Sequence, residues 1–547
     1  MKKFISFAIA VILSLGFVAC GDNGVNTDEW QNDSGEEPIT LTWFVNVDTF
    51  TKQFGDNMTD REIFRRTGVK LVFSNSDSVS GSAKLNTMIM KDSLTDFVST
   101  PAEGAAHVQM IKGKKIWDMK SLFDTYSSVE DFVPADMYKW CSYPQDGKLY
   151  GIRSHFFGDD CQPGQLLANM VMVASSNLME KYNINAETDF SSIDKLIATL
   201  EKVKKGEETS GKKGFIPFYT NSGGEELNEF LAIPRETESG DYLDWHETPA
   251  AEDLAVKMNE MYRKGLISDL ALTDSLKMRE AMLQERTFLV LMNFASSQYY
   301  MWDVYDDLGD EYVAVGPLRN DNGDDPTLTC WTPNGYLATA ISKKCKYPER
   351  ALKLLRFLYS DEGQILSNFG IEGESYYIGE DGKYYYTNEF YSLTEKEAAD
   401  KYGFSWYEVL TSRTPFWKSL TGLPLDARAK STQLIHKEFS QYAYNTRVWN
   451  SIHPTDTTTG LPGVMSTASG KFVWTQIITS ANSTVSKEEA ERIVRAKYKE
   501  QLNARNTLAI GTVSYSDVKE FYNTKFKEHK ETLGKKYAWP AYADKNN

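Results

Sequence analysis

The sequence predicts an α/β fold for most of the chain. Between residues 39 and 292, short runs rich in β-branched and aromatic residues alternate with longer stretches in which apolar residues recur every three or four positions. Strands that alternate with helices favour parallel sheets covered by helices on both faces. With 547 residues, of which 41% are hydrophobic and 13% aromatic, the chain has ample material for a large core, and a disordered chain is excluded.

The α/β part of the chain begins at Ile39 with a predicted β-α-β unit. Ile39 to Val45 form the first strand, and Thr59 to Glu62 have the Thr-x-x-Glu spacing of a capping box, which begins a helix. Gly68 ends this helix before a strand at Val69 to Phe73. The next predicted elements are a helix at Ala83 to Asp92 and a strand at Asp96 to Ser99.

The alternation continues beyond residue 169, and a helical tail follows it. Further strands are predicted at Met170 to Ala174, Phe215 to Tyr219 and Thr287 to Met292, with helices at Ser191 to Lys205 and Ala250 to Lys264. Tyr376 to Tyr386 form a predicted hairpin with its turn at Asp381-Gly382. From about Glu395 onward long helices predominate, at Leu425 to Tyr444, Lys487 to Asn503 and Ser516 to Glu531.

The first 38 residues predict export and a membrane tether. Lys2 and Lys3 precede an apolar run that ends at Val18, and a helix of that length spans about 22 Å, short of the roughly 30 Å hydrocarbon core. This pattern is typical of a secretion signal. Phe17 to Cys20 resembles a bacterial lipobox, in which the cysteine is lipidated; an ordinary signal peptide followed by an unrelated cysteine is the alternative. Residues 21–38 are polar and are expected to form a flexible tether.

The net charge limits the classes of partner, and the number of cysteines limits the possible disulfides. The formal net charge of −16 disfavours a nucleic-acid partner. Four cysteines remain in addition to Cys20, and their even number permits the pairs Cys141/Cys161 and Cys330/Cys345 as readily as four free thiols.

The sequence does not predict an enzyme. The six histidines are scattered, with no His-Glu-x-x-His pair, and there is no Gly-x-Ser-x-Gly motif. A glycoside hydrolase needs only two carboxylates that lie close together in space, and the sequence does not show which carboxylates do. This class of enzyme therefore stays a minor alternative.

Several segments together resemble the extracellular solute-binding proteins of carbohydrate ABC importers, in particular the large oligosaccharide-binding lipoproteins. None of these motifs is catalytic, and their order over more than three hundred residues carries the resemblance. The segments are Leu41-Thr42-Trp43-Phe44, Arg66 to Leu71, Leu94 to Val98, Asp146 to Ile152, Tyr347 to Ala351, Ser360 to Gln364 and Asn368 to Gly373.

This resemblance implies a two-lobe, type II periplasmic-binding-protein-like fold with hinge-crossing strands, a ligand held between the lobes and a helical C-terminal extension. The expected division is a signal peptide at 1–19, the lipidated Cys20 and tether at 20–38, a first lobe at 39–155 plus 325–378, and a second lobe at 156–324 plus 379–547. The resemblance implies an extracytoplasmic, lipid-anchored, monomeric subunit that delivers a carbohydrate to a permease. A surface glycan-binding lipoprotein without a transport role is the alternative.

Aromatic and polar residues near predicted strand ends are candidate ligand contacts, because sugar rings stack on flat apolar faces and their hydroxyls need polar partners. In the first lobe these are Trp43 and Asp96, and near the hinge Trp331 and Asn334. In the second lobe they are Tyr219, Trp245, Phe294, Ser296 and Trp302. For each aromatic residue, a place in the core is the alternative.

No cofactor or metal is expected. Relatives often carry a calcium loop after the helix that corresponds to Ser191 to Lys205, but Gly206 to Lys213 lack the alternating Asp or Asn oxygens that calcium needs.

Overall fold

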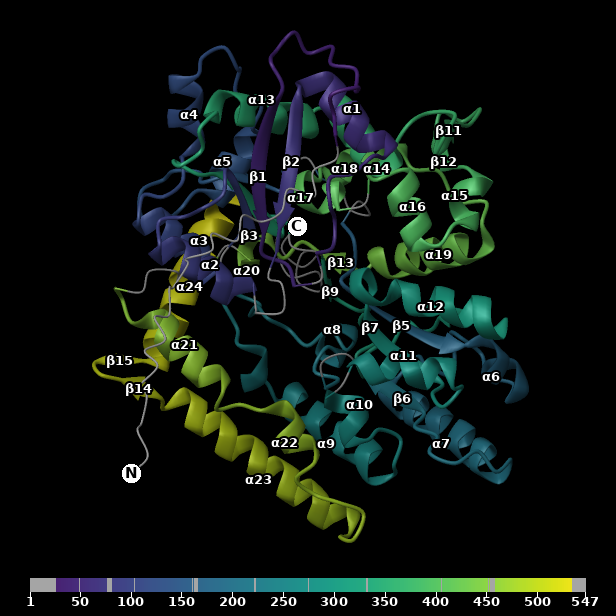
Figure 1. Cartoon of the computed structure of the whole chain (residues 1–547). Coiled ribbons are helices and arrows are strands. Elements are labelled where there is room, and N and C mark those ends of the chain that lie inside the picture. Colours follow the sequence, from purple (N-terminus) through teal and green to yellow (C-terminus); the bar gives the residue numbers. More distant parts are fainter. Residues whose placement is uncertain are drawn as a thin grey trace, which may run out of the picture.

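The computed structural model describes residues 26–533 except 49, 76–80, 103, 160, 162–165, 221–222, 274, 331–332, 405, 451 and 453–457. The predicted signal peptide, the lipidation residue Cys20 and the candidate Trp331 therefore lie outside the described residues. The chain forms two lobes, one above the other in Figure 1, each built on its own sheet.

The first lobe is built on a five-stranded sheet in the order β2-β1-β3-β10-β4. Its strands are β1 (Ile39–Val45), β2 (Val69–Ser74), β3 (Phe97–Pro101), β4 (Ile152–Arg153) and β10 (Leu337–Ile341). β1 is parallel to β2 and β3, whereas β10 is antiparallel to β3 and β4, because it enters the sheet from the second lobe. The helices between these strands include α1 (Met58–Thr67), α2 (Gly81–Met90) and α3 (Ala105–Lys112).

The first helix begins one residue before the predicted capping box. Asn57 is the N-cap of α1, and its side chain accepts a hydrogen bond from the backbone N–H of Asp60. Gly68 ends the helix as predicted, in the left-handed region at φ +62°, which a glycine adopts without strain.

The second lobe is built on a four-stranded sheet in the order β6-β7-β5-β8. Its strands are β5 (Met170–Ser175), β6 (Phe218–Thr220), β7 (Leu289–Asn293) and β8 (Tyr312–Ala314). β6 and β7 are parallel, but β5 is antiparallel to both β7 and β8. Both sheets are therefore mixed, which the alternation of strands and helices alone did not predict.

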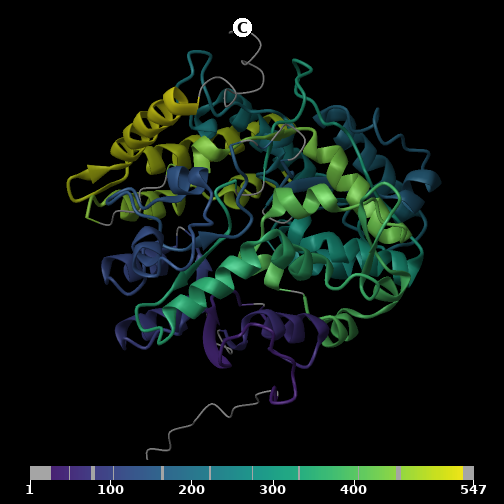
Figure 2. The ribbon, with the colours of Figure 1, turned by 90° about the horizontal axis from the view of Figure 1, so that it is seen from above.

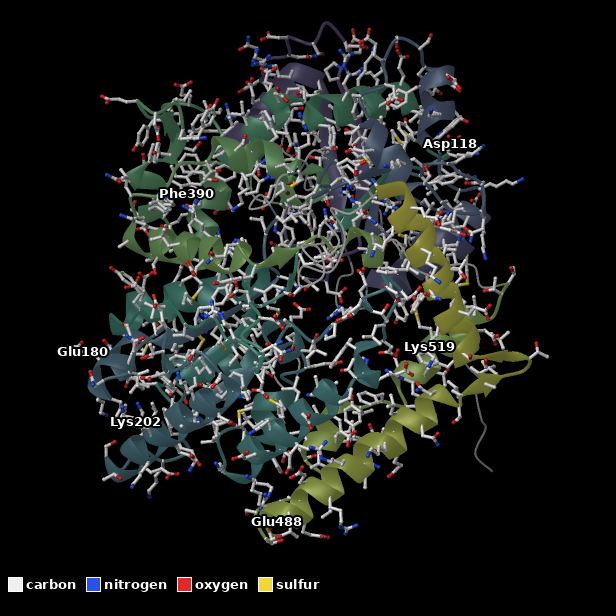
Figure 3. All side chains as sticks on the ribbon, turned by 180° about the vertical axis from the view of Figure 1, so that it is seen from behind. Asp118, Glu180, Lys202, Phe390, Glu488 and Lys519 are labelled. Carbon is white, nitrogen blue, oxygen red and sulfur yellow. The ribbon has the colours of Figure 1, made fainter. Side chains whose placement is uncertain are left out.

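Helices cover these sheets with one apolar face each. In α7 (Ile193–Thr209), Leu196, Leu200 and Val203 are buried at helical spacing, and the side chain of Ser192 caps the first turn. Lys202, on the same helix, points outward, as does Glu488 on α23 (Lys487–Asn506) (Figure 3). The sequence pattern thus gives each of these helices one face that is buried in the core and one face that is exposed to solvent.

Antiparallel segments cross between the lobes. The isolated bridges Phe156↔Asn334 and Ala168↔Cys330 join the chain that leaves β4 to the chain that enters β10. Beside them, β9 (Leu328–Thr329) pairs in parallel with β13 (Ala443–Tyr444) from the tail. These crossings place the ends of both sheets next to the hinge.

The helical tail contributes to the cores of both lobes, whereas the expected division placed residues 379–547 with the second lobe. Tyr407 and Leu410 of α17 (Tyr407–Thr411) are fully buried in the first core, and the hydroxyl of Thr339 on β10 donates to the carbonyl of Leu410 at 3.0 Å. The second core takes α19 (Ala427–Ser440), α22 (Trp474–Ile478) and α23.

The remaining tail elements lie at the periphery. The predicted hairpin is formed by β11 (Tyr376–Ile378) and β12 (Tyr384–Tyr386). The C-terminal helices α21 (Leu461–Ser469), α23 and α24 (Tyr515–Leu533) flank one side of the molecule, and Figure 2 shows them in yellow and yellow-green, apart from β1 and β2 in purple.

Candidate binding site between the lobes

The edge of the first sheet that faces the hinge carries the carboxyl ends of its parallel strands. β3 ends at Pro101 and β4 at Arg153, and the antiparallel β10 begins there at Leu337. Gly335, at φ +90°, allows the incoming strand to pass close to this edge, since a Cβ atom there would lie 2.7 Å from the Cβ of Arg153. In open α/β sheets, ligands bind outside such carboxyl ends.

The corresponding edge of the second sheet is polar. The Nδ2 of Asn293, the last residue of β7, donates to the Oδ1 of Asn169 at 2.6 Å, and Asn169 directly precedes β5. In the crossing strand, the backbone N–H of Thr329 donates to Glu229 at 2.8 Å. Burial raises the pKa of the Glu229 carboxyl, although nearby Arg235 and the bonds from Thr329 oppose that rise.

A short tail helix lies between the end of β4 and the second lobe. In α18 (Thr414–Leu420), the Oγ1 of Thr414 lies 2.8 Å from the Nδ1 of His155, two residues after β4. From the second lobe, the Nε2 of His436 lies 3.0 Å from the carbonyl oxygen of Ala168, and its ring stacks on Phe294 with 3.9 Å between centroids. His155 thus contacts α18 directly, and His436 stacks on the first residue of α12 in the second lobe.

Burial dominates the electrostatics around this helix. It lowers the pKa of His155 to about 4 and that of His436 to about 3, with the charge of Lys418 on α18 as a second cause for both. Both imidazoles are therefore neutral at neutral pH. The pKa of Lys418 itself is lowered to about 8 by burial, and its Nζ lies 4.6 Å from the centroid of the neighbouring Trp417 ring.

A family model described as bacterial extracellular solute-binding protein matches residues 47–368 of this sequence. The chain belongs to this family. The α/β, two-lobe fold implied by the sequence is thereby confirmed, and membership places the protein outside the cytoplasm. No curated protein sequence matches the chain.

Solved structures of solute-binding proteins share the fold over nearly the whole chain. An EF-hand mutant of the ABC-transporter substrate-binding protein FusA from S. pneumoniae, in complex with fructo-nystose, is 16% identical with a TM-score of 0.65, covering 90% of this chain and 100% of its own. A human-milk-oligosaccharide (HMO) binding, ABC-transporter-associated protein from Bifidobacterium longum infantis is 14% identical with a TM-score of 0.62, covering 90% and 99%. The alginate-binding protein AlgQ2, without calcium ion, is 17% identical with a TM-score of 0.58, covering 91% and 99%.

The structure places Trp43 of this solute-binding protein in the core of the first lobe. Its side chain is 0% exposed, its ring packs against Phe73 and Phe97, and its Nε1 donates to the Oγ of Ser99 at 2.8 Å. An indole without an exposed face cannot stack on a sugar, so Trp43 is not among the residues that we propose to bind ligand.

Asp96 lies at the wrong end of its strand for the predicted role. β3 begins at Phe97, so Asp96 precedes the strand instead of ending it. Its Oδ2 accepts hydrogen bonds from the backbone N–H and the hydroxyl of Thr42, at 2.8 and 2.7 Å. Asp96 therefore joins β1 to β3 at the edge away from the hinge.

Three of the second-lobe aromatic candidates hold the lobe together. Tyr219 is buried within β6, and Trp245, in the 3-10 helix Trp245–Glu247, stacks on His246 at 3.9 Å. Trp302 on α12 (Phe294–Leu308) donates through Nε1 to the Oγ1 of Thr432 on α19 at 2.9 Å. Their rings pack between elements of the same lobe.

The remaining candidates lie nearer the hinge. Phe294, the first residue of α12, is 5% exposed and stacks on His436, so it reaches the site through that imidazole. Ser296 lies in the same helix, but its side chain is not among those described. Asn334, in the crossing strand, is 4% exposed, and neither its Nδ2 nor its Oδ1 has a hydrogen-bond partner.

The sequence reasoning missed His155, Thr414 and Lys418, whereas Trp417 was considered together with Trp406 and Trp449 as a wall of the site or as a residue that pins the tail helices. His155 follows the segment Asp146 to Ile152 by three residues, and this position is a signal that could have identified it. Thr414 and Lys418 lie more than 250 residues further on, in a tail that was expected to cover the second lobe, and no local signal joins them to β4.

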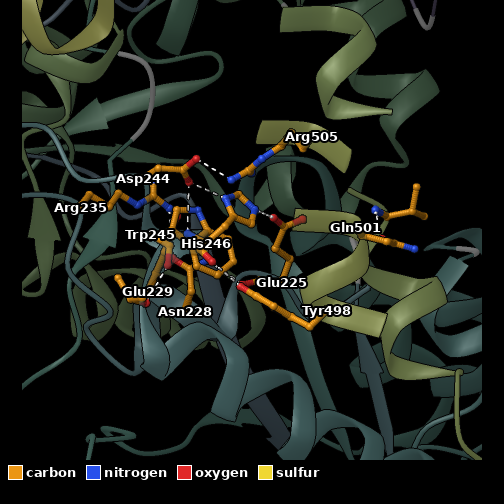
Figure 4. Close-up of polar contacts among 12 residues, drawn as sticks. Glu225, Asn228, Glu229, Arg235, Asp244, Trp245, His246, Tyr498, Gln501 and Arg505 are labelled. Atoms are coloured by element: carbon orange, nitrogen blue, oxygen red, sulfur yellow. Dashed lines mark hydrogen bonds and ion pairs between the residues drawn. The ribbon is translucent and has the colours of Figure 1, made fainter. Parts of the chain in front are cut away.

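In the second lobe, a buried ionic cluster fastens the C-terminal helices to the rest of that lobe (Figure 4). Asp244 accepts from Arg505 on α23 at 2.6 Å, and its Oδ1 lies 2.9 Å from the Nδ1 of His246. The Nε2 of His246 lies 3.0 Å from Glu225. Burial alone would raise the pKa of Asp244, but His246 and Arg505 lower it to about 2.

Ammonium groups pair with carboxylates near the end of α7 and in the loop that follows it. The Nζ of Lys181 lies 2.6 Å from the buried carboxylate of Glu207, and Lys212 lies 3.4 Å from Glu285. In the described part of the chain, no group of three or more His, Cys, Asp or Glu side chains is arranged to hold a metal ion.

Two further features of the described residues concern disulfide bonds and the length of apolar helices. Among the described residues, no disulfide bond is formed by Cys141, Cys161, Cys330 or Cys345. Among the residues described, no helix is both long and apolar enough to span a bilayer.

Proposed function

We propose that this protein captures an oligosaccharide between its two lobes outside the cell membrane and delivers it to the permease of an ABC importer. The observation that carries the proposal is family membership over residues 47–368, together with a shared fold over 90% of the chain with FusA, whose complexes contain fructo-nystose and kestose. Hinge closure over the ligand would present a closed form to the permease. ATP hydrolysis would then belong to another subunit.

The local geometry supports the proposed site. The polar ends of both sheets, Asn169 and Asn293 in one lobe and Asn334 in the crossing strand, supply amide groups suited to sugar hydroxyls. Trp417, partly exposed on α18, supplies a flat apolar face, and its Nε1 is held by the Oγ of Ser412 at 2.9 Å.

The N-terminal segment supports a lipid anchor. The mature chain would begin at Cys20, carry acyl chains on that cysteine and hang from the membrane by residues 21–38. We propose that the protein acts as a monomer, because capture and delivery need one pair of lobes.

A thermal-shift screen of the purified mature protein against mono- and oligosaccharides tests the function. A ligand that binds only the folded state raises the Tm as its concentration rises. An oligosaccharide that raises the Tm, with no release of reducing ends, is the expected result. A shift with peptides or amino acids alone contradicts the sugar assignment, and release of reducing ends supports a glycoside hydrolase instead.

A further inference from the structure

Lys418 lies between the lobes without a negatively charged partner. Thr414, one helical turn before it on the same face of α18, contacts His155 at the end of β4. From the other lobe, His436 on α19 lies close enough for the lysine charge to lower its pKa. Among the described residues, none forms a salt bridge or hydrogen bond with the Lys418 ammonium group, whose contact is the Trp417 ring.

The contrast with Lys52 shows that Lys418 lacks a partner. Lys52 is buried and compensated, since its Nζ lies 3.2 Å from Asp60 and 2.7 Å from the carbonyl oxygen of Gly403. Lys418 is partly exposed, and no carboxylate among the described residues pairs with it. An anionic group can therefore approach its ammonium group without displacing a protein carboxylate.

A second unpaired cation lies at the same end of β4. Arg153 is 6% exposed, and its described hydrogen bond runs from Nη2 to the carbonyl of Cys141 at 3.3 Å. Its Nε and Nη1 have no partner, and no carboxylate among the described residues forms an ion pair with it. Arg153 and Lys418 are thus two cations without a carboxylate partner among the described residues, in a protein whose net charge is −16.

The neighbours of Lys418 leave this positive charge unbalanced. His155 and His436 are neutral at neutral pH, as derived above, and so contribute no counter-charge. On α14 (Asp361–Phe369), which packs beside α18, Asp361 is already paired with Arg413 at 2.5 Å. An anionic group of a ligand would therefore meet an ammonium group that no described carboxylate occupies.

We propose that Lys418 binds an anionic group of the ligand, so that the protein selects acidic oligosaccharides over neutral ones. The shared chemistry is an anionic oxygen, either a uronate carboxylate or a sulfate ester, which accepts from the ammonium group while the adjoining sugar ring lies near Trp417. Arg153 adds to the positive potential at longer range. The inference rests on the proposed function, because it specifies the ligand of the same site.

The test is calorimetric titration of the mature protein with three probes of equal length: an oligogalacturonate, a sulfated galactan oligosaccharide and a neutral galacto-oligosaccharide. At least one acidic probe is expected to bind about 10-fold or more tightly than the neutral one, and to weaken as salt rises. Which acidic probe binds distinguishes carboxylate from sulfate.

The variant Lys418→Gln is expected to lose about 10-fold or more in affinity for the acidic probe, while its affinity for the neutral probe changes less than about 3-fold. Lys437→Gln is the matched control, because Lys437 is exposed on α19 directly after His436 and carries the same charge. Removing an uncompensated charge is not expected to lower the Tm. Lys418→Arg, which keeps the charge, is expected to retain the preference.

Equal binding of acidic and neutral probes overturns this inference and leaves the proposed function standing. An equal loss of affinity for both probes in Lys418→Gln has the same consequence, and so does binding of the neutral probe alone. Failure of every glycan to bind overturns the proposed function and this inference together.

Discussion

The Nδ1 of His155 lies 2.8 Å from the Oγ1 of Thr414, so the end of β4 is joined to a helix that follows it by more than 250 residues. Thr414 is fully buried, and the backbone N–H of His155 also donates to the carbonyl of Ser412 at 2.8 Å. This contact fixes α18, with Trp417 and Lys418, at the hinge edge of the first lobe.

Thr414→Val removes the hydroxyl but keeps the shape of the side chain. We expect the free energy of unfolding to fall by about 1–2 kcal/mol, because the partly buried imidazole loses this hydrogen bond. Ligand affinity should fall too, since α18 loses one of its attachments. Urea denaturation and titration measure the two effects. Thr87→Val, on the exposed face of α2, is the control, and equal behaviour of the two variants would contradict the role of Thr414.

Trp43→Ala tests whether this indole is a core residue. Because Trp43 is fully buried against Phe73 and Phe97, we expect a loss of about 3–5 kcal/mol in the free energy of unfolding. Tyr299→Ala, at a side chain that is 55% exposed, should change stability by less than about 0.5 kcal/mol. A Trp43→Ala protein of normal stability that fails to bind ligand would instead restore Trp43 as a ligand contact.

The lowered pKa values of His155 and His436 predict a loss of stability in mild acid. Their folded pKa values, about 4 for His155 and about 3 for His436, lie below the unfolded value of about 6.5. The unfolded chain therefore binds more protons below pH 6.5, and the free energy of unfolding should fall as the pH drops from about 6.5 toward 4. His436→Gln, whose amide can still donate to Ala168, should show a smaller fall in Tm between pH 7 and pH 5. An unchanged fall would show that His436 does not contribute.

The Asp244 cluster predicts the opposite dependence at higher pH. Burial opposes the charged form of His246, but the hydrogen bonds that its imidazole donates to Asp244 and Glu225 outweigh this effect and raise its pKa. Its contribution to stability is complete below pH 6.5 and is lost as the pH rises through the raised pKa. His246→Gln should flatten the decline in Tm from pH 6 to pH 9. A decline as steep as that of the unaltered protein would exclude this origin.

Arg505→Met should detach the C-terminal helices from the second lobe. Arg505 and Asp244 are each 5% exposed and 2.6 Å apart, so removing one partner leaves a buried charge, at a cost of about 3–5 kcal/mol. Arg492→Met on the same helix breaks an exposed pair with Glu489 and should leave the Tm unchanged. Equal Tm values for the two variants would contradict the structural role of the cluster.

The ammonium groups near the loop after α7 predict indifference to calcium. Because Lys181 already compensates Glu207, neither calcium nor a chelator should shift the Tm of the mature protein. A rise in Tm with calcium concentration would show that a site exists after all.

Much of the fold could be predicted from the sequence, because its elements carry local signals. The period of two in Ile39–Val45, the period of 3.6 in α7 and the glycine at position 68 each determine a neighbouring stretch of chain. The antiparallel entry of β5 and β10 carries no such signal, since it depends on which lobe the chain has just left.

The site could be predicted less well, because it is assembled from distant segments. Trp43 was predicted from the rule that ligands lie beyond strand ends. It lies two residues before the end of β1, however, and its ring faces the core. Lys418 lies in a stretch whose local sequence suggests only a short helix. Its significance comes from His155 and His436, which the tertiary fold brings toward it from both lobes.

Hydrogen–deuterium exchange of the mature protein, with and without a saturating oligosaccharide from the thermal-shift screen, tests the central claim most directly. Capture between the lobes predicts slower exchange in segments from both, namely residues 153–157, 293–300 and 412–420. Protection confined to one lobe, or to the outer helices α21 to α24, would contradict binding between the lobes.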